Sequence, residues 1–331
     1  MYENLIELTN HQIQQVCQAV AQLNLRRVYF VACGGSLATL YPGKYLLERL
    51  TDQIYAETYN AAEFLCTPPA ALDSNTLVVF NSQSGSTPET VKAAQLAADC
   101  GALTVAFTVM PDSPLDQIAA HTIYYYDDPL HPFPAVLTIF PEIYKLTWAL
   151  LDILNHSNTL PSVNTAMNML QHTFDTACAQ HISAARTFAQ THHSESLLYT
   201  VSSGLDACIG YIMTNCLIME SLWKHSSALH AGEFFHGAFE AIDSSSPVLA
   251  LLGLGPNRQI EERAVKFLLR KTSKLVVIDA ASIDLSAYPA FLREPIAALV
   301  LNRLCALYVE EMSFVLGHPI SSRRYMGVEK Y

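Results

Sequence analysis

Short apolar runs rich in β-branched and aromatic residues alternate with segments of helical spacing along the first part of this chain. Runs of this length are typical of strands that are buried on both faces of a parallel sheet. They lie at residues 27–32, 53–59, 76–80, 102–108 and 122–127. Because strands and helices alternate at this spacing, the sequence predicts an α/β fold with a parallel sheet and right-handed crossovers.

The same pattern restarts in the second half of the chain. Residues 196–204 predict a strand that runs into a loop of small residues, and further strands are expected within 246–255 and 274–280. An offset of 170 residues pairs Tyr29 with Tyr199, Val31 with Val201 and Gly34 with Gly204. This self-similarity predicts two similar α/β halves.

The domain boundaries are placed from this pattern. The segment 155–164, NHSNTLPSVN, is the most linker-like part of the chain. We therefore expect an N-terminal helix over 1–25, a first domain over 26–155, a second domain over 156–317 and a tail over 318–331.

Composition excludes several classes of protein. The formal net charge is −11, which disfavours nucleic acid as a partner, because proteins that bind its backbone need basic faces. We see no signal peptide at the N-terminus and no apolar run of the roughly 20 residues that a membrane-spanning helix needs. We therefore expect no membrane partner. The eight cysteines include no C-x-x-C pair, so we expect reduced thiols in the core and a cytoplasmic location.

A hydroxyl-rich loop, NSQSGSTPET (81–90), follows the strand expected at 76–80. The next helix is expected to start at Thr87 or Pro88, so its N-terminus and positive dipole end face this loop. Gly85 lets the backbone approach a ligand closely. One helix cap needs one hydroxyl, whereas residues 82–87 hold four. The loop therefore predicts a phosphate site.

The loop after the first strand, ACGGSLAT (32–39), is a second candidate. Gly34 and Gly35 free the backbone, and Ser36 is placed to reach the same anion. Both loops follow strands of one parallel sheet, and open α/β sheets bind ligands at that carboxyl edge.

Residues 219–237 concentrate titratable groups in a largely apolar setting. No H-E-x-x-H or matching spacing of histidine and cysteine is present, so a zinc site is disfavoured. An acid–base pair is the favoured interpretation, on a helix followed by a loop that ends between Gly232 and Gly237. The groups in question are Glu220, Glu233, His225, His230 and His236.

Three motifs together, ACGGS, SQSGSTPET and GEFFHG, resemble the sugar isomerase (SIS) family. The chain looks like the isomerase half of glucosamine-6-phosphate synthase and the related fructosamine-6-phosphate deglycases, over nearly its whole length. The closing segment HPISSRRYMGVEKY (318–331) looks most like the deglycase branch.

The resemblance implies two SIS subdomains, each a flavodoxin-like three-layer αβα sandwich, and a homodimer with shared active sites. It implies a catalytic Glu220 and a catalytic His236 that comes from the neighbouring subunit. No metal or organic cofactor is implied. His230 and Glu233 are further candidates whose role the residues leave open. The expected phosphate ligands are Ser36, Ser82, Gln83, Ser84 and Thr87, and the tail residues expected over the site are Arg323, Arg324 and Tyr325.

Two departures from the synthase narrow the expected chemistry. No glutaminase domain is expected before the first SIS half, because Met1 is followed by Tyr2 and not by a nucleophilic cysteine. The synthase lysine that lies three residues before the catalytic glutamate is replaced here by Leu217. Glutamine-derived ammonia is therefore not expected as a substrate.

The resemblance favours a deglycase that splits a phosphorylated sugar–amino acid conjugate into a hexose 6-phosphate and a free amino acid. Two alternatives stay open, an aldose–ketose isomerase of a hexose phosphate and a sugar-phosphate sensor. The sequence leaves undecided which amine is released and whether its nitrogen starts on C1 or C2. The proline-rich segment 127–135, DDPLHPFPA, is expected to line the sugar site.

Overall fold

The computed structural model describes residues 2–127 and 132–329, which form two compact units divided between Gln171 and His172. The division falls inside one long helix, α7 (Leu160–His192). Residues 128–131, within the proline-rich segment expected to line the sugar site, lie outside the described residues. Each unit is an α/β body with its own parallel sheet.

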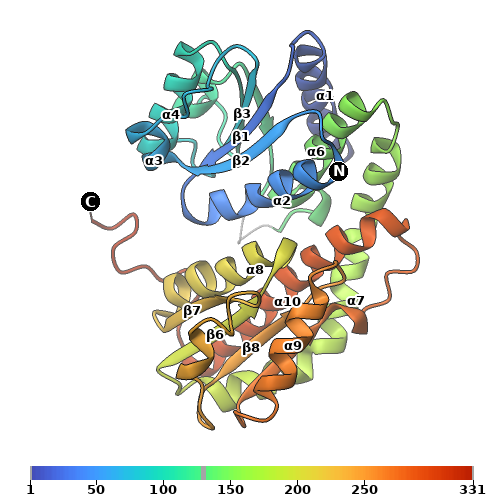
Figure 1. The fold of residues 1–331 in the computed structure, drawn as a ribbon. Helices are drawn as coiled ribbons and strands as arrows, with labels where there is room; N and C mark the ends of the chain where they lie inside the picture. The colour runs from blue at the N-terminus through green and yellow to red at the C-terminus, as the bar shows by residue number, and fades with distance from the viewer. Residues whose placement is uncertain (1, 128–131, 330–331) are drawn as a thin grey trace. The chain divides into compact units, whose positions relative to one another are not determined.

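The first unit contains a five-stranded parallel sheet in the order β2-β1-β3-β4-β5 (Figure 1). All five strands were predicted from the apolar runs, to within a few residues at their ends. Their bounds are β1 (Arg27–Ala32), β2 (Tyr55–Asn60), β3 (Thr76–Asn81), β4 (Leu103–Thr108) and β5 (His121–Tyr124).

Helices cover both faces of this sheet, which gives three layers (Figure 1). One face carries α3 (Ala61–Cys66), α4 (Pro88–Asp99) and α5 (Pro114–Ile118). The other carries α1 (Glu3–Val20), α2 (Gly34–Leu50) and α6 (Ile139–Asn155), and α6 follows a short 3-10 turn, η1 (Ala135–Leu137).

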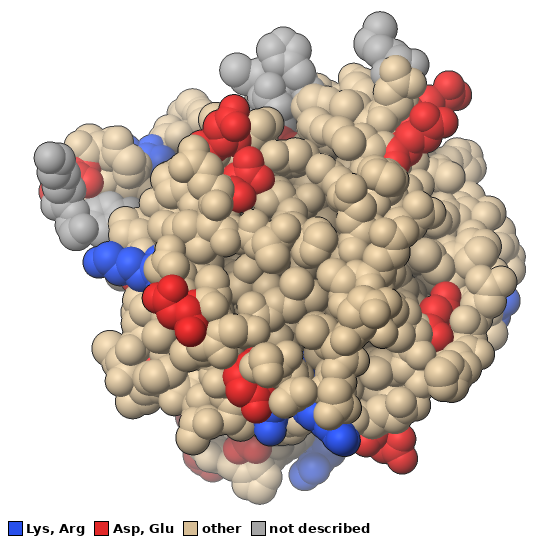
Figure 2. All heavy atoms as spheres, turned by 90° about the horizontal axis from the view of Figure 1, so that it is seen from above, with Lys and Arg blue, Asp and Glu red and all other residues tan. Residues whose placement is uncertain are grey.

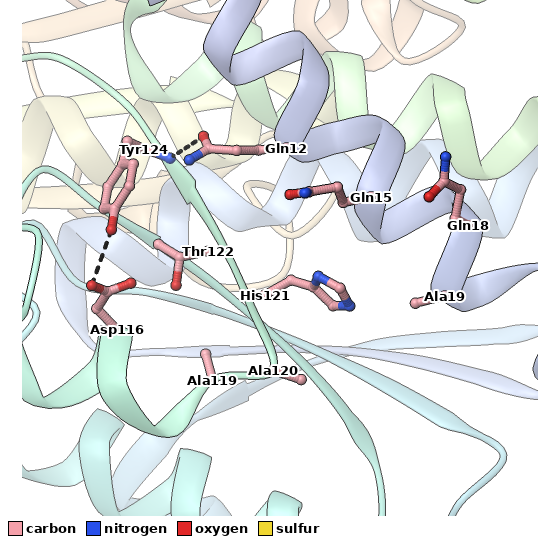
Figure 3. A pocket seen from close by; sticks show the side chains of 10 residues that line it. All are labelled: Gln12, Gln15, Gln18, Ala19, Asp116, Ala119, Ala120, His121, Thr122 and Tyr124. Carbon is pink, nitrogen blue, oxygen red and sulfur yellow. Dashed lines mark hydrogen bonds between the residues drawn. The ribbon is translucent and has the colours of Figure 1, made fainter.

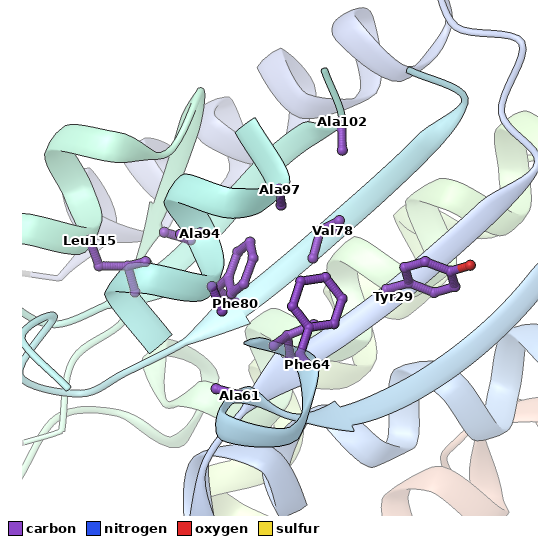
Figure 4. Close-up of a cluster of buried hydrophobic side chains, with 12 residues drawn as sticks. Tyr29, Ala61, Phe64, Val78, Phe80, Ala94, Ala97, Ala102 and Leu115 are labelled. Carbon is purple, nitrogen blue, oxygen red and sulfur yellow. The ribbon is translucent and has the colours of Figure 1, made fainter. Parts of the chain in front are cut away.

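Alternation along the central strands explains why both faces are covered. Tyr29 and Val78 point into a cluster with Phe64 of α3 and Ala94 of α4, as Figure 4 shows. Their neighbours along each strand are equally buried and face the opposite layer, because successive strand residues alternate between faces. A strand buried on both sides is apolar between its ends, and β1 (RVYFVA) and β3 (TLVVFN) carry polar residues only at their ends.

The second unit repeats the design with four parallel strands in the order β7-β6-β8-β9. The strands are β6 (Leu197–Ser202), β7 (His225–His230), β8 (Val248–Leu252) and β9 (Leu275–Asp279). One face carries α9 (Arg258–Leu268), and the other carries α8 (Ala207–Tyr211) with its π-helical continuation η3 (Ile212–Glu220) and α10 (Arg293–Leu316). Short 3-10 turns complete the unit: η2 (Gly204–Asp206), η4 (Ala238–Ala241), η5 (Ala280–Ser282) and η6 (Ala290–Leu292).

Two expectations about local structure were wrong. Part of the segment expected to be a loop after Glu220 is the strand β7, which is polar (HSSALH) because it is the edge strand and is only partly buried. The linker-like segment 155–164 is already helical from Leu160 onward.

Charged side chains are sparse on the face shown in Figure 2, where apolar and neutral residues dominate. Lys and Arg are scattered there among Asp and Glu and form no broad basic surface on this face. No helix within the described residues is long and apolar enough to cross a membrane.

An ion pair lies in the core of the first unit. Lys145 Nζ and Glu142 Oε1 are 3.0 Å apart on consecutive turns of α6, and both side chains are almost fully buried. Burial raises the pKa of Glu142, and the charge of Lys145 opposes that shift. Glu142 therefore depends on its lysine to stay charged in the core.

Replacing the lysine alone, Lys145→Met, is expected to lower the free energy of unfolding at pH 7 by about 3–5 kcal/mol, because it leaves a buried carboxylate uncompensated. Since the folded-state pKa of Glu142 lies above its unfolded value, the loss should shrink as the pH falls through that raised pKa. Urea unfolding at several pH values measures both effects. The double variant Glu142→Leu/Lys145→Met is the control, and an equally large loss there would contradict the interpretation.

Candidate functional site

The carboxyl ends of β1 and β3 form a switch point in the first sheet. The two strands are neighbours, but the chain leaves β1 toward β2 and leaves β3 toward β4, on opposite sides. Open α/β sheets bind ligands in the crevice that this reversal leaves at the strand ends. Both loops that the sequence marked as phosphate candidates start there, at Cys33 and Ser82.

The loop after β3 gathers its hydroxyls at the start of α4. Ser82 Oγ lies 2.9 Å from Thr87 Oγ1, and Ser84 Oγ lies 2.9 Å from Ser86 Oγ. Ser82 is buried, whereas Ser84 and Gln83 are exposed. Hydroxyls and the N-terminal end of a helix are together a suitable environment for an anion. The structure thus brings Ser82, Ser84 and Thr87 onto one short loop.

Gly85 fixes the shape of this loop. Its φ is 62°, in the left-handed region that favours glycine. Its N–H donates to the Ser82 carbonyl (3.0 Å), and its own carbonyl accepts from the Leu115 N–H (2.9 Å). A Cβ at this position would overlap the hydroxyl of Ser113. The loop is therefore held against the start of α5.

Asn81 joins the two candidate loops, and sequence reasoning did not single it out. Its Nδ2 donates to Thr39 Oγ1 (2.8 Å) and to the carbonyl of Ser36 (3.4 Å). This ties the first turn of α2, which carries Ser36, to the end of β3. The available signal was a polar residue that directly continues the buried run TLVVF. Gln83 points elsewhere, with Nε2 3.5 Å from the carbonyl of Asp127.

Glu220 is the last residue of the π-helical segment η3 in the second unit. Its Oε1 pairs with Arg323 Nη2 at 2.7 Å, and both side chains are partly exposed. A groove surrounds the pair. Its lining includes Trp223, Lys224 and Tyr325. The structure therefore places tail residues beside Glu220.

Trp223 contacts two residues of the tail beside this groove. Its φ is 58°, an unusual value for a bulky residue, and such strain is most often found at functional sites. The guanidinium of Arg324 lies 4.3 Å from its ring centroid, and the ring of His318 packs edge-on at 4.4 Å. Trp223 was not picked out from the sequence, because nothing in its local pattern separates it from a core aromatic.

The described chain does not bring Glu220 and His236 together. Glu220 precedes the amino end of β7, and His236 follows its carboxyl end. The strand runs from His225 to His230, so five steps of about 3.3 Å put roughly 17 Å between its ends. His236 is exposed in the turn beyond β7. Its catalytic role stays a prediction.

The other singled-out groups of this segment shape the turn after β7. His230 Nδ1 accepts a hydrogen bond from the Gly232 N–H (3.1 Å), and its carbonyl accepts from the Glu233 N–H (2.9 Å). Glu233 itself is exposed. Within the described residues no three His, Cys, Asp or Glu side chains cluster as a metal site would need.

A second groove, on the first unit, is polar and lies away from the strand ends that hold the hydroxyl loop. It runs between α1 and the edge strand β5, and its lining includes Gln12, Gln15 and Gln18 of α1 and His121 of β5 (Figure 3). Gln12 Oε1 accepts from the Tyr124 N–H at 3.0 Å, and the Tyr124 hydroxyl donates to Asp116 at 3.0 Å. With a carboxylate and no Lys or Arg in its lining, this groove does not suit a phosphate.

Comparison with known proteins shows which class of protein has this fold. Residues 23–151 match the SIS domain. A crystal structure of a Bacillus subtilis protein described as a phosphosugar isomerase superposes with a TM-score of 0.93 at 39% identity, covering 97% of both chains. The chain is thus a SIS-domain protein with two α/β subdomains.

The relatives identify the branch. The chain is 40% identical over 324 residues to fructosamine deglycase FrlB of Bacillus subtilis, covering 97% of this chain and 98% of that protein. It is 29% identical over 333 residues to the fructoselysine 6-phosphate deglycase of Escherichia coli K12, covering 99% and 94%. The chain belongs to the fructosamine deglycase family of SIS-domain proteins.

Gly85→Ala is expected to weaken binding of fructose 6-phosphate about tenfold or more, because a left-handed φ and an overlap with Ser113 together strain the loop by about 1–3 kcal/mol. Calorimetric titration measures the affinity. Gly101→Ala is the matched control, since Gly101 also has a positive φ (79°) but space for a Cβ. Equal losses of affinity in the two variants would show that the loop of Gly85 is not part of the binding site.

Proposed function

We propose that this protein is a fructosamine-6-phosphate deglycase, which cleaves a phosphorylated sugar–amino acid conjugate to a hexose 6-phosphate and a free amino acid. The observation that carries the proposal is that a chain of this family presents the partly exposed carboxylate of Glu220 in a groove lined by Arg323, Arg324 and Lys224. A carboxylate that solvent and substrate can reach is the group needed for proton transfer at carbon.

The phosphate is assigned to the switch point of the first sheet. Ser82 and Thr87 are within hydrogen-bond distance of each other and belong to the loop that opens α4. Ser36 lies in the first turn of α2 and is tied to the same place through Asn81. With Ser84 these groups offer neutral donors, supplemented by two helix N-termini. Neutral donors at helix ends bind phosphate without a cluster of cations.

Glu220 is assigned as the group that moves the proton. In an Amadori-type substrate, nitrogen is bonded to C1 and a carbonyl lies at C2. Glu220 removes a proton from C1 to give an enaminol, and the proton returns to C2, which leaves an imine at C1. Water adds to that imine, the C–N bond breaks, and aldose 6-phosphate and amine are released. One carboxylate serves first as base and then as acid.

Arg323 is assigned a positioning role in this reaction. Its ion pair holds one oxygen of Glu220 in place and leaves the other for the substrate. The stack of Arg324 on Trp223 fixes the tail segment that carries both arginines. The described part of the tail, residues 318–329, is thus proposed to complete the groove.

His236 is proposed to act from a second copy of the chain. Within one chain β7 separates it from Glu220, so a histidine that opens the sugar ring or protonates an oxygen at this carboxylate would come from a partner. The proposed assembly is a homodimer with shared active sites. A cytoplasmic location is proposed with it, on the basis of the eight unpaired cysteines found among the described residues.

Glu220→Gln is expected to lower the rate of amino acid release by about 100-fold or more, because an amide cannot exchange the proton. The substrates are fructoselysine, glucoselysine and fructose-aspartate 6-phosphates, with fructose 6-phosphate alongside, and released amino acid and hexose 6-phosphate are measured. Glu240→Gln, an exposed carboxylate elsewhere in the second unit, should behave as wild type.

Each outcome of this assay points to one reading. Amino acid release that disappears in Glu220→Gln supports the deglycase and names the amine. Turnover of fructose 6-phosphate alone would replace the deglycase by a plain isomerase. Binding of panel members without any turnover would leave a sugar-phosphate sensor.

Mixing two inactive variants tests the shared site. Glu220→Gln and His236→Ala are each expected to be inactive as pure dimers. When equal amounts are unfolded together and refolded, half of the dimers should be hybrids with one intact site of two, which restores about a quarter of wild-type activity. No recovery, with hybrid dimers demonstrated by differently tagged chains, would place both residues in the same subunit.

A further inference from the structure

The second sheet has a switch point of its own. Its strand order β7-β6-β8-β9 repeats the first four strands of the first sheet, so β6 and β8 correspond to β1 and β3. The 170-residue offset maps Gly34 onto Gly204, and both glycines have a φ of 56°. The loops that begin at Ser203 and Gly253 therefore occupy the place that the two phosphate-candidate loops have in the first unit.

A carboxylate of the chain itself lies between these loops. Glu261 of α9 is only 2% exposed. Its Oε1 accepts from the Ser203 hydroxyl at 2.8 Å, and its Oε2 accepts from the Gly253 N–H at 3.0 Å. The backbone N–H of Ser203 adds a third donor. Donors from both loops thus converge on one carboxylate, in the way that such loops converge on a bound anion.

No cation of the described residues is ion-paired with Glu261. Arg258, one turn earlier in α9, pairs instead with Asp279 at 2.7 Å and with Glu262 at 2.9 Å. Glu261 is therefore held by a hydroxyl and backbone N–H groups. These groups belong to the residues that directly follow the ends of β6 and β8.

The rest of the switch point is acidic where the first unit has hydroxyls. At the 170-residue offset Ser36 corresponds to Asp206, which is 6% exposed and whose Oδ1 has no hydrogen-bond partner within the described structure. Asp206 points at the Gly253 loop, because a Cβ on that glycine would overlap its Oδ2. Burial, together with Glu261 and Glu294, raises the pKa of Asp206 well above its usual range.

We propose that the loops after β6 and β8 form an oxyanion-binding site for a small carboxylate, and that the side chain of Glu261 is its permanent, built-in ligand. The second unit then keeps the anion-binding geometry of a switch point, but the side chain of Glu261 occupies the position of the anion. The correspondence with the first unit rests on the proposed function, whereas the site itself rests on the contacts of Glu261. It follows that the chain offers a free anion position at one of its two switch points.

The test removes the carboxylate of Glu261 and supplies formate in its place. Glu261→Ala keeps α9 helical and leaves the three donors facing a cavity. Thermal unfolding is followed in sodium formate and in sodium chloride of equal ionic strength. Glu261→Ala is expected to unfold at a lower temperature than wild type, and formate, but not chloride, should raise its midpoint by about 2 °C or more in a saturable way.

Two controls separate the site from general effects of the salt. Wild type reports formate binding elsewhere, including the first switch point. Glu262→Ala removes the neighbouring, exposed carboxylate of the same helix. If formate raises the midpoint of Glu261→Ala no more than that of these two proteins, the built-in-ligand proposal is wrong. Because the readout is stability, this result is independent of whether the protein is a deglycase.

A variant that does not fold on its own still decides the question. Glu261→Ala is then refolded from urea in formate and in chloride, and the soluble, cooperatively unfolding fraction is compared. A higher yield in formate supports an oxyanion site, and equal yields overturn it. Glu261→Gln fills the cavity but points an amide N–H₂ donor at the N–H and hydroxyl donors of the loops. Its refolding yield should not rise in formate.

Discussion

The pairing of β1 with β3 in a sheet that is buried on both faces is the constraint on which the first unit depends. Each strand must be apolar between its ends, so its polar groups are confined to the ends. Because the chain leaves the two strands in opposite directions, the ends of both remain uncovered by a crossover helix. The hydroxyl loop, the glycine turn before α2 and Asn81 all lie at that one opening.

Much of the fold was predictable because its strands are buried on both sides. Such strands carry their signal locally, as runs rich in Val and Phe, and β1, β3 and β4 were found this way. The edge strands β2 and β5 are less buried and were found from short runs rich in tyrosine. The hydroxyl loop was equally visible, since four hydroxyls in six residues exceed what a cap needs. The strand β7 was missed for the converse reason, because an edge strand alternates with solvent and its residues look like a loop.

The remaining site features depend on contacts across long stretches of sequence. Asn81 gains its role from Thr39, and Glu220 gains its partner from Arg323, more than one hundred residues further along the chain. Glu261 looks in sequence like an ordinary helical glutamate and acquires meaning only through Ser203 and Gly253. At corresponding positions the first unit has Ser36 and the second has Asp206, so the two switch points differ in the groups that line them.

The position of β7 between Glu220 and His236 has a consequence for the protein in solution. If both residues act on one substrate, a single chain is inactive and only the dimer catalyses the reaction. Activity per molecule would then fall on dilution below the dissociation constant of the dimer, and a cell could set the rate through the amount of protein. A copy that lacks one of the two residues would still leave one working site in a dimer with an intact chain, whereas a copy that lacks both would disable both sites of that dimer.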